Sequence, residues 1–184
     1  MSYYTFKNFK LLSDDEKRLV WEWRNHDEIR KWMYNQDVIS FDKHISFVES
    51  LKTDNTKQYW IVRRKDEYAG VTSIVNYDKY AGEMGYYISP YLHRKNIGIE
   101  YYYYFLEFLF ETLKLQEVYG YTVVCNSKAN SINRFFKSES EIIQKDIHGE
   151  KVNFFFIQIG KSKWVDEIKN DSKIQQILNI IKRM

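Results

Sequence analysis

The chain has 184 residues and a formal net charge of +3; 44% of its residues are hydrophobic and 29% are charged. This balance predicts one globular domain with a sizeable core and excludes a disordered chain. The net charge is small and the sequence has no long basic runs, so a nucleic-acid binder is not expected. The single cysteine, Cys125, excludes an intramolecular disulfide and offers no metal-ligand spacing, so we interpret it as a small buried residue.

No apolar run in the sequence indicates a membrane segment. The start, Met1 to Tyr4, has no signal-peptide pattern, and the most apolar run, residues 101–110, is too short to cross a bilayer and contains Glu107. We therefore expect a cytoplasmic protein without a membrane partner.

The periodicity of apolar residues predicts an α/β chain with a mixed sheet, in the order β-α-α-β-β-β-α-β-α-β-β. Ser13 and Glu16 have capping-box spacing, and Ser40 is a second helix cap. We expect one domain over residues 1–160, followed by an amphipathic helix. The predicted elements are a strand at 3–12, a helix interrupted near 25–27, a helix after 40, strands at 58–63, 69–76 and 83–88, a helix at 97–113, a strand at 118–124, a helix at 129–137, strands at 141–147 and 152–159, and the terminal helix at 161–184.

The basic turn at residues 89–99, between a short strand and a long apolar helix, has the pattern of a phosphate cradle. The first N–H groups of a helix lack intrahelical partners, and the helix dipole favours an anion there. Gly98 would let a ligand approach the backbone, and Asn96 tolerates a left-handed conformation. The alternative is an ordinary solvated loop.

With this element order, His93 to Gly98 resembles the pyrophosphate loop of the GCN5-related N-acetyltransferases (GNAT), Gln/Arg-x-x-Gly-x-Gly/Ala, with His93 and Asn96 as departures. The resemblance implies a GNAT-like fold and acetyl-coenzyme A as co-substrate, without a metal. It also implies that the co-substrate is bound by the strand before the loop, by the loop itself and by a later asparagine: Tyr86, Tyr87, Ile88, His93, Arg94, Lys95, Asn96, Ile97, Gly98, Ile99 and Asn126.

A second set of motifs resembles one GNAT subgroup, the UDP-4-amino-4,6-dideoxy-N-acetyl-altrosamine N-acetyltransferases of the pseudaminic acid pathway. The motifs are Trp23-Arg24-Asn25-His26, Trp32-Met33-Tyr34, Ile39-Ser40 with His44 and Phe47, and Gly70-Val71 with Ser73-Ile74. The implied substrate-binding residues are Arg24, Met33, Tyr34, His44, Phe47 and Ser73. As alternatives, Arg24 pairs with Asp27 or Glu28 on the surface, Met33, Tyr34 and Phe47 belong to the core, and His44 lies on a helix surface.

Acetyl transfer to an amine needs a base for the amine and an acid for the leaving thiolate. Glu83, at the start of a strand, is the candidate base, and its alternative is an exposed residue at the strand edge. The family's tyrosine acid has no counterpart, because its position falls on Asn133 or Phe135 in the two alignments of residues 126–135. Asn133 is therefore one candidate for the acid, and Tyr121 is the other.

We therefore expect an acyltransferase that moves acetyl to a small-molecule primary amine, first the 4-amine of a nucleotide-linked amino sugar. The alternatives are a protein N-terminal amine, another small amine such as an aminoglycoside, and a non-catalytic coenzyme A-binding module. The sequence leaves the oligomeric state open.

Overall fold

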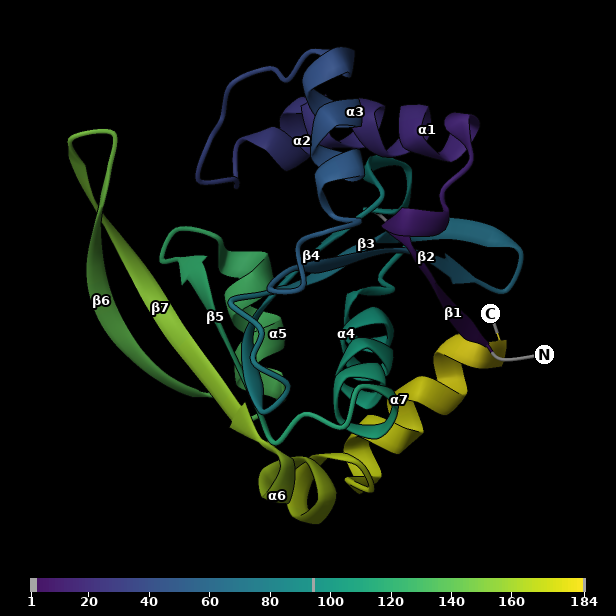
Figure 1. Ribbon diagram of the computed structural model, residues 1–184. Coiled ribbons are helices and arrows are strands. Elements are labelled where there is room, and N and C mark those ends of the chain that lie inside the picture. The colour runs from purple at the N-terminus through teal and green to yellow at the C-terminus, as the bar shows by residue number, and fades with distance from the viewer. Residues whose placement is uncertain (1–2, 94, 184) are drawn as a thin grey trace. The chain divides into compact units, whose positions relative to one another are not determined.

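The computed structural model describes residues 3–93 and 95–183, and Figure 1 shows its elements. The described chain divides into two compact units. The N-terminal unit comprises Met1–Tyr77 and Met84–Lys95, and the C-terminal unit comprises Asp78–Glu83 and Asn96–Met184. The division falls within β4 (Ala81–Ile88), so this strand contributes to both units.

The N-terminal unit contains an antiparallel sheet and three helices. β1 pairs with β2, and β2 pairs with β3, both in antiparallel register. A buried apolar cluster joins the helices to this sheet, and Trp23 of α1, Val48 of α3 and Ile61 of β2 belong to it. The elements are β1 (Tyr4–Asn8), α1 (Asp14–Asn25), α2 (Asp27–Arg30), α3 (Phe41–Ser50), β2 (Gln58–Arg64) and β3 (Glu67–Val75).

The start of α1 is fixed by the predicted capping box. The Ser13 hydroxyl accepts the Glu16 backbone N–H, and the Glu16 carboxylate accepts the Ser13 N–H at 2.7 Å. Glu16 is only 7% exposed and also accepts from Lys7 Nζ at 2.6 Å and from the Tyr68 hydroxyl at 2.9 Å. One carboxylate therefore connects α1 to β1 and β3.

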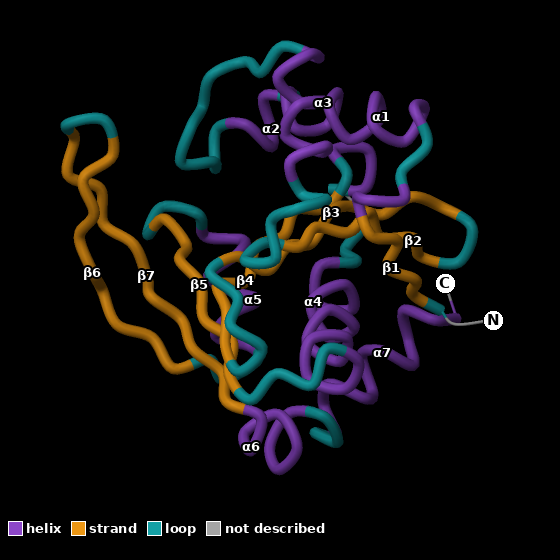
Figure 2. Tube along the Cα trace, viewed as in Figure 1, coloured by secondary structure: helices purple, strands orange, loops and turns teal. Residues whose placement is uncertain are grey.

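The C-terminal unit contains the rest of the sheet and its helices. The first part of β4 runs parallel to β5, and β7 pairs antiparallel with both β5 and β6. The strand order is β1-β2-β3-β4-β5-β7-β6, which confirms the predicted mixed α/β class (Figure 2). The elements are α4 (Gly98–Glu107), β5 (Glu117–Val123), α5 (Ser127–Phe135), β6 (Glu139–Ile147), β7 (Glu150–Gly160), α6 (Lys161–Lys163) and α7 (Ser172–Arg183).

Three local predictions were wrong. The first strand ends at Asn8, because a 3-10 turn occupies Phe9–Leu11. The single helix expected over residues 161–184 is divided, since the Asp171 carboxylate accepts the N–H groups of residues 173 and 174 and begins a new helix, α7. Cys125 is exposed rather than buried, because it lies in the turn after β5.

Among the described residues, no helix combines the length and the apolar character needed to cross a membrane.

Candidate active site

The loop between α2 and α3, residues 31–40, carries Met33 and Tyr34 and is fastened to α1 and α2 by side-chain bonds to its backbone. Asn25 makes two of these bonds, donating to the Ile39 carbonyl and accepting the Ile39 N–H, both at 2.8 Å. Trp21 donates to the same carbonyl at 2.6 Å. These contacts fix the end of the loop against α1, and we call residues 31–40 the α2–α3 loop.

Arg24 takes part in the same attachment. Its Nη2 donates to the Asn35 carbonyl at 2.6 Å, so the alternative to its predicted binding role, a surface ion pair with an acidic neighbour, is wrong. Those neighbours are paired elsewhere, Asp27 with Arg30 at 2.6 Å and Glu28 with Lys31 at 2.9 Å.

The second terminal nitrogen of Arg24, Nη1, is buried and has no hydrogen-bond partner among the described residues. Burial lowers the pKa of Arg24, and an electrostatic interaction with Tyr87 opposes part of that decrease. Burial in turn raises the pKa of Tyr87 above its ordinary range. Arg24 thus holds a guanidinium donor beside Tyr87 within the N-terminal unit, an arrangement that suits an anionic or hydroxyl-rich ligand.

The remaining predicted acceptor residues fall into two groups. Met33 is half-buried and Tyr34 is 43% exposed, so the α2–α3 loop presents both to its surroundings. Phe47 instead packs against the apolar core and meets Tyr59 edge-on, with ring centroids 5.1 Å apart. Phe47 is only partly buried there, so its predicted role in acceptor binding stays a prediction.

His44 is a buried residue of α3 rather than one on a helix surface. The residue is 5% exposed, its ring stacks on Phe41 and it hydrogen-bonds to the Lys17 backbone carbonyl. Burial lowers the pKa of His44, and the bond to Lys17 opposes part of that shift. The other ring nitrogen, Nε2, is buried and has no hydrogen-bond partner among the described residues, so the predicted contact with a substrate phosphate stays a prediction.

Ser73 and Gly85 show how closely β3 and β4 approach each other in the N-terminal unit. The Ser73 hydroxyl donates to the Gly85 carbonyl at 3.4 Å. A Cβ atom added at Gly85 would lie only 2.8 Å from that hydroxyl oxygen, closer than side chains tolerate. Further along β4, burial raises the pKa of Tyr86. At its end, His93 Nε2 donates to the Ile88 carbonyl at 3.0 Å, and this bond holds the beginning of the loop against the strand.

The predicted phosphate cradle has the required backbone. Asn96 adopts a left-handed conformation with φ of 54°, as expected, and α4 begins at Gly98. Ile97 is the N-cap residue and provides no side-chain cap, which leaves the first-turn N–H groups to a ligand or to water. Lys95 makes an exposed ion pair with Glu67 at 3.4 Å. Arg94 lies outside the described residues, and Ile99 belongs to the first turn of α4.

Glu83 and Tyr121 share one face of the sheet in the C-terminal unit. Glu83 is the register partner of Tyr119, and Tyr121 lies two residues beyond Tyr119 on β5, so the three side chains share a face. Burial raises the pKa of Tyr121, and the Glu83 carboxylate raises it further. The candidate base and one candidate acid are therefore electrostatically coupled.

Asn133, the other candidate acid, contacts the opposite face of the sheet. Its amide donates to the Thr122 hydroxyl at 3.2 Å, and Thr122 points away from Tyr121 because successive strand residues alternate. This hydrogen bond joins α5 to β5, and Asn133 is only 5% exposed. Asn126, predicted to bind the co-substrate, caps α5 by accepting the Ala129 N–H at 3.2 Å.

Comparison with known proteins identifies the class to which this fold and this loop belong. The Acetyltransferase (GNAT) domain family matches residues 9–134. The chain belongs to this family, and it is an acyltransferase that uses acetyl-coenzyme A as co-substrate.

Among its relatives is the acetyltransferase PseH of Campylobacter jejuni. One such sequence is 32% identical over 159 residues, which cover 85% of this chain and 93% of the relative. The crystal structure of the C. jejuni N-acetyltransferase PseH in complex with acetyl-coenzyme A superposes with a TM-score of 0.66 at 25% identity, covering 85% of this chain and 98% of that one. The spermidine N-acetyltransferase of Vibrio cholerae shares the fold, with a TM-score of 0.78 at 19% identity, over 90% of this chain and 100% of that one.

The residues at the start of α4 fit this co-substrate. A diphosphate accepts hydrogen bonds from backbone N–H groups, and the uncapped first turn behind the left-handed Asn96 supplies such donors. Acetyl-coenzyme A, when bound, supplies an activated thioester. The residues of the chain have to hold that thioester, bind the acceptor and remove a proton from the amine.

Proposed function

We propose that the protein acetylates the 4-amine of a UDP-linked 4-amino-4,6-dideoxy sugar, the reaction that the motif resemblance implies in the pseudaminic acid pathway. The observation that carries this proposal is the match to the acetyltransferase PseH of C. jejuni along 93% of that relative. The motifs around Trp23 to His26 and Trp32 to Tyr34 support the same acceptor.

Arg24 and the α2–α3 loop are assigned to the acceptor. Arg24 Nη1 is a buried donor without a partner among the described residues, which suits a phosphate or a sugar hydroxyl. Tyr34 is exposed and Met33 half-exposed, and side chains of these types can stack on a uracil or a sugar ring. Ser73 stays in this set as a hydroxyl on β3 that can accept a hydrogen bond from the acceptor, because its own proton is donated to the Gly85 carbonyl.

Glu83 is assigned to remove the proton from the amine, directly or through a water, before the amine attacks the thioester. The attack forms a tetrahedral intermediate with an oxyanion, and collapse of that intermediate breaks the C–S bond. The departing coenzyme A thiolate then takes a proton. Tyr121 is the proposed donor of that proton, because it shares the sheet face with Glu83 and is electrostatically coupled to it. A backbone N–H of β4 is the proposed donor to the developing oxyanion.

The test is a mass-spectrometric acetylation assay with acetyl-coenzyme A and a panel of amines. The panel contains UDP-linked amino sugars, a peptide with a free N-terminus, spermidine and an aminoglycoside. We expect one acetyl group on a UDP-linked amino sugar and a higher kcat/KM for it than for the other amines. Turnover of the peptide alone, or binding of coenzyme A without turnover of any amine, would reject the proposal in favour of the corresponding alternative.

The Arg24→Met variant tests whether Arg24 binds the acceptor. It should raise KM for the UDP-linked sugar while leaving the stabilisation by acetyl-coenzyme A unchanged, since neither role of Arg24, holding the α2–α3 loop and binding the acceptor, involves the co-substrate. A parallel loss of coenzyme A affinity would contradict this assignment.

A further inference from the structure

Lys145, a residue that the sequence motifs do not include, lies over the aromatic surface beside Glu83. It sits on β6, and its Nζ is 3.0 Å from the centroid of the Tyr121 ring on β5 and 5.9 Å from that of Phe154 on β7. The pairing of the strands explains this position. Lys145 is the register partner of Val152, and Phe154 lies two residues beyond Val152, so these side chains share one face.

The same face carries a row of rings between the two charges. Tyr121 is the register partner of Phe156, and their ring centroids are 5.4 Å apart, while Tyr119 and Phe156 are separated by 6.0 Å. Glu83 is at the β4 end of this row and Lys145 at the β6 end. We call the side chains of Glu83, Tyr119, Tyr121, Phe156 and Lys145 the charged aromatic face.

The opposite side of β5 is joined to α5, through the bond from Asn133 to Thr122. Figure 2 shows the β5, β7 and β6 strands that carry the charged aromatic face. Tyr119, Tyr121 and Lys145 are each half-buried, so their side chains remain partly open to solvent.

Electrostatics connect the two ends of this face. Burial lowers the pKa of Lys145, and the Glu83 carboxylate opposes that decrease. The ring of Tyr121 offers the ammonium a face of negative potential, which orients the flexible side chain before any ligand arrives. An ammonium held in this way is a positioned binding group, in contrast to a lysine that extends into water.

We propose that Lys145 binds an anionic group of the acceptor, so that the charged aromatic face selects an amine that also carries a phosphate. The inference rests on the proposed function for the role of Glu83 at the amine. Lys145 would favour the phosphate of a nucleotide-linked or phosphorylated amino sugar, and it would repel the additional positive charges of a polyamine. It would thus be a specificity-determining residue.

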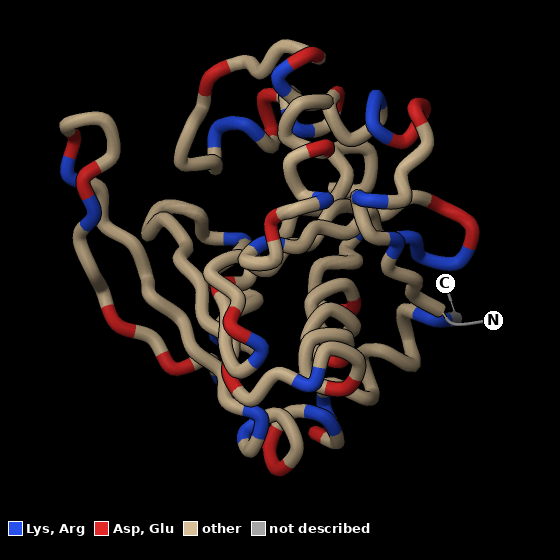
Figure 3. Tube along the Cα trace, viewed as in Figure 1, with Lys and Arg blue, Asp and Glu red and all other residues tan. Residues whose placement is uncertain are grey.

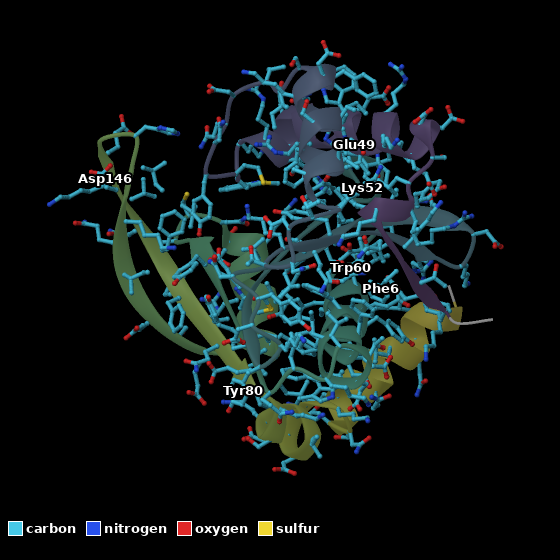
Figure 4. All side chains as sticks on the ribbon, viewed as in Figure 1. Phe6, Glu49, Lys52, Trp60, Tyr80 and Asp146 are labelled. Carbon is cyan, nitrogen blue, oxygen red and sulfur yellow. The ribbon has the colours of Figure 1, made fainter. Side chains whose placement is uncertain are left out.

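The variants separate the charge of Lys145 from its packing. Lys145→Met keeps an apolar stem against the rings and removes the charge, whereas Lys145→Arg keeps the charge. Lys151→Met is the matched control, because Lys151 is an exposed lysine of the same hairpin, in register with Asp146. Figure 3 shows charges of both signs along this hairpin, and Figure 4 labels Asp146 near its end.

The experiment compares two acceptors with the same 4-amino sugar: one carries the anionic uridine diphosphate at the anomeric position, and the other carries a neutral methyl group there. Lys145→Met should lower kcat/KM for the UDP-linked sugar by about tenfold, the effect of one partly exposed charge-assisted contact, and leave the methyl glycoside within twofold. Lys145→Arg should recover most of the loss, and Lys151→Met should match the wild type. Equal losses on both acceptors, or no loss on either, would overturn the inference.

A binding measurement keeps this test independent of the proposed function. Ligand-observed NMR with UDP and with glucosamine 6-phosphate, at fixed ionic strength, measures anion binding whichever amine is the substrate. The wild type and Lys151→Met should bind at least one of these probes about tenfold more tightly than Lys145→Met does. If the UDP-linked sugar is not a substrate but this difference persists, the proposed function fails and the inference stands. Absence of binding to the wild type would overturn the inference.

Discussion

Asn25 provides the sharpest test of how the α2–α3 loop is held. The Asn25→Ala variant removes two neutral hydrogen bonds to Ile39, each 2.8 Å long, and leaves the Trp21 bond to the same carbonyl in place. Such bonds each contribute about 1 kcal/mol net, so local opening of the loop should become easier by about 2 kcal/mol. That change corresponds to roughly 30-fold faster hydrogen exchange at the Ile39 amide.

The functional consequence follows from what this loop carries. Because Met33 and Tyr34 are assigned to the acceptor, Asn25→Ala should raise KM for the acceptor, and the stabilisation by acetyl-coenzyme A should persist. Asn25→Asp is the chemical control, since it retains the acceptor for the Ile39 N–H and loses only the donor; its effect on exchange should be intermediate. Unchanged exchange at the Ile39 amide in Asn25→Ala would refute the reasoning, and faster exchange with unchanged KM would remove the loop from acceptor binding.

Three further predictions concern other parts of the molecule. Saturating acetyl-coenzyme A, at about 100 times Kd, should stabilise the protein by about 2.7 kcal/mol and raise Tm by roughly 5–10 °C. Gly98→Val should abolish this shift, because its side chain would keep the ligand from the backbone. The control Gly160→Ala, where an added Cβ is 3.8 Å from its nearest neighbour, should retain the shift. Glu83→Gln should lower kcat about 100-fold at neutral pH and recover in part as pH rises, because more of the amine is then already neutral; full activity at every pH would reject the base assignment. Glu16→Ala should cost about 3 kcal/mol at pH 7 by thermal denaturation, and an equal loss in Asp14→Ala, whose ion pair is exposed, would contradict this.

The pH dependence of the Glu16 contribution has a definite sign. Burial raises the pKa of this carboxyl, but the hydrogen bonds from Lys7, Ser13 and Tyr68 outweigh burial and lower the pKa below its ordinary value. A group whose folded pKa is lowered stabilises the fold above its unfolded pKa, about 4.3, and loses that contribution as pH falls through the folded value. The difference in Tm between wild type and Glu16→Ala should therefore shrink below about pH 4.

Much of the local structure could be predicted because its signals are short-range. The capping box of Ser13 and Glu16, the cap at Ser40 and the left-handed Asn96 each depend on residues within a few positions along the chain, and the structure confirms all three. The break before α7 was missed because Asp171 lies within an otherwise continuous amphipathic pattern, where a helix cap looks like one more polar residue.

The candidate site was less predictable, because it depends on which face each residue takes. The helical spacing of Phe47 and His44 indicates that both point inward, but it does not distinguish the core from a pocket. In the structure, Phe47 packs against the apolar cluster and the His44 ring is buried. Lys145 reaches Tyr121 only through the register of β5, β7 and β6, a non-local arrangement. The sequence did offer one signal: Lys145 lies two residues from Ile143 and from residue 147 on β6, and side chains two residues apart on a strand share a face.

The most direct test of the central claim is to locate the transferred acetyl group. The purified protein is incubated with carbon-13-labelled acetyl-coenzyme A and the UDP-linked 4-amino-4,6-dideoxy sugar, and the product is analysed by NMR. The proposed function predicts an amide at the sugar C4 position, with a correlation from the labelled carbonyl to the amide proton on that nitrogen. Label found on another amine of a panel acceptor, with none on this sugar, would contradict it.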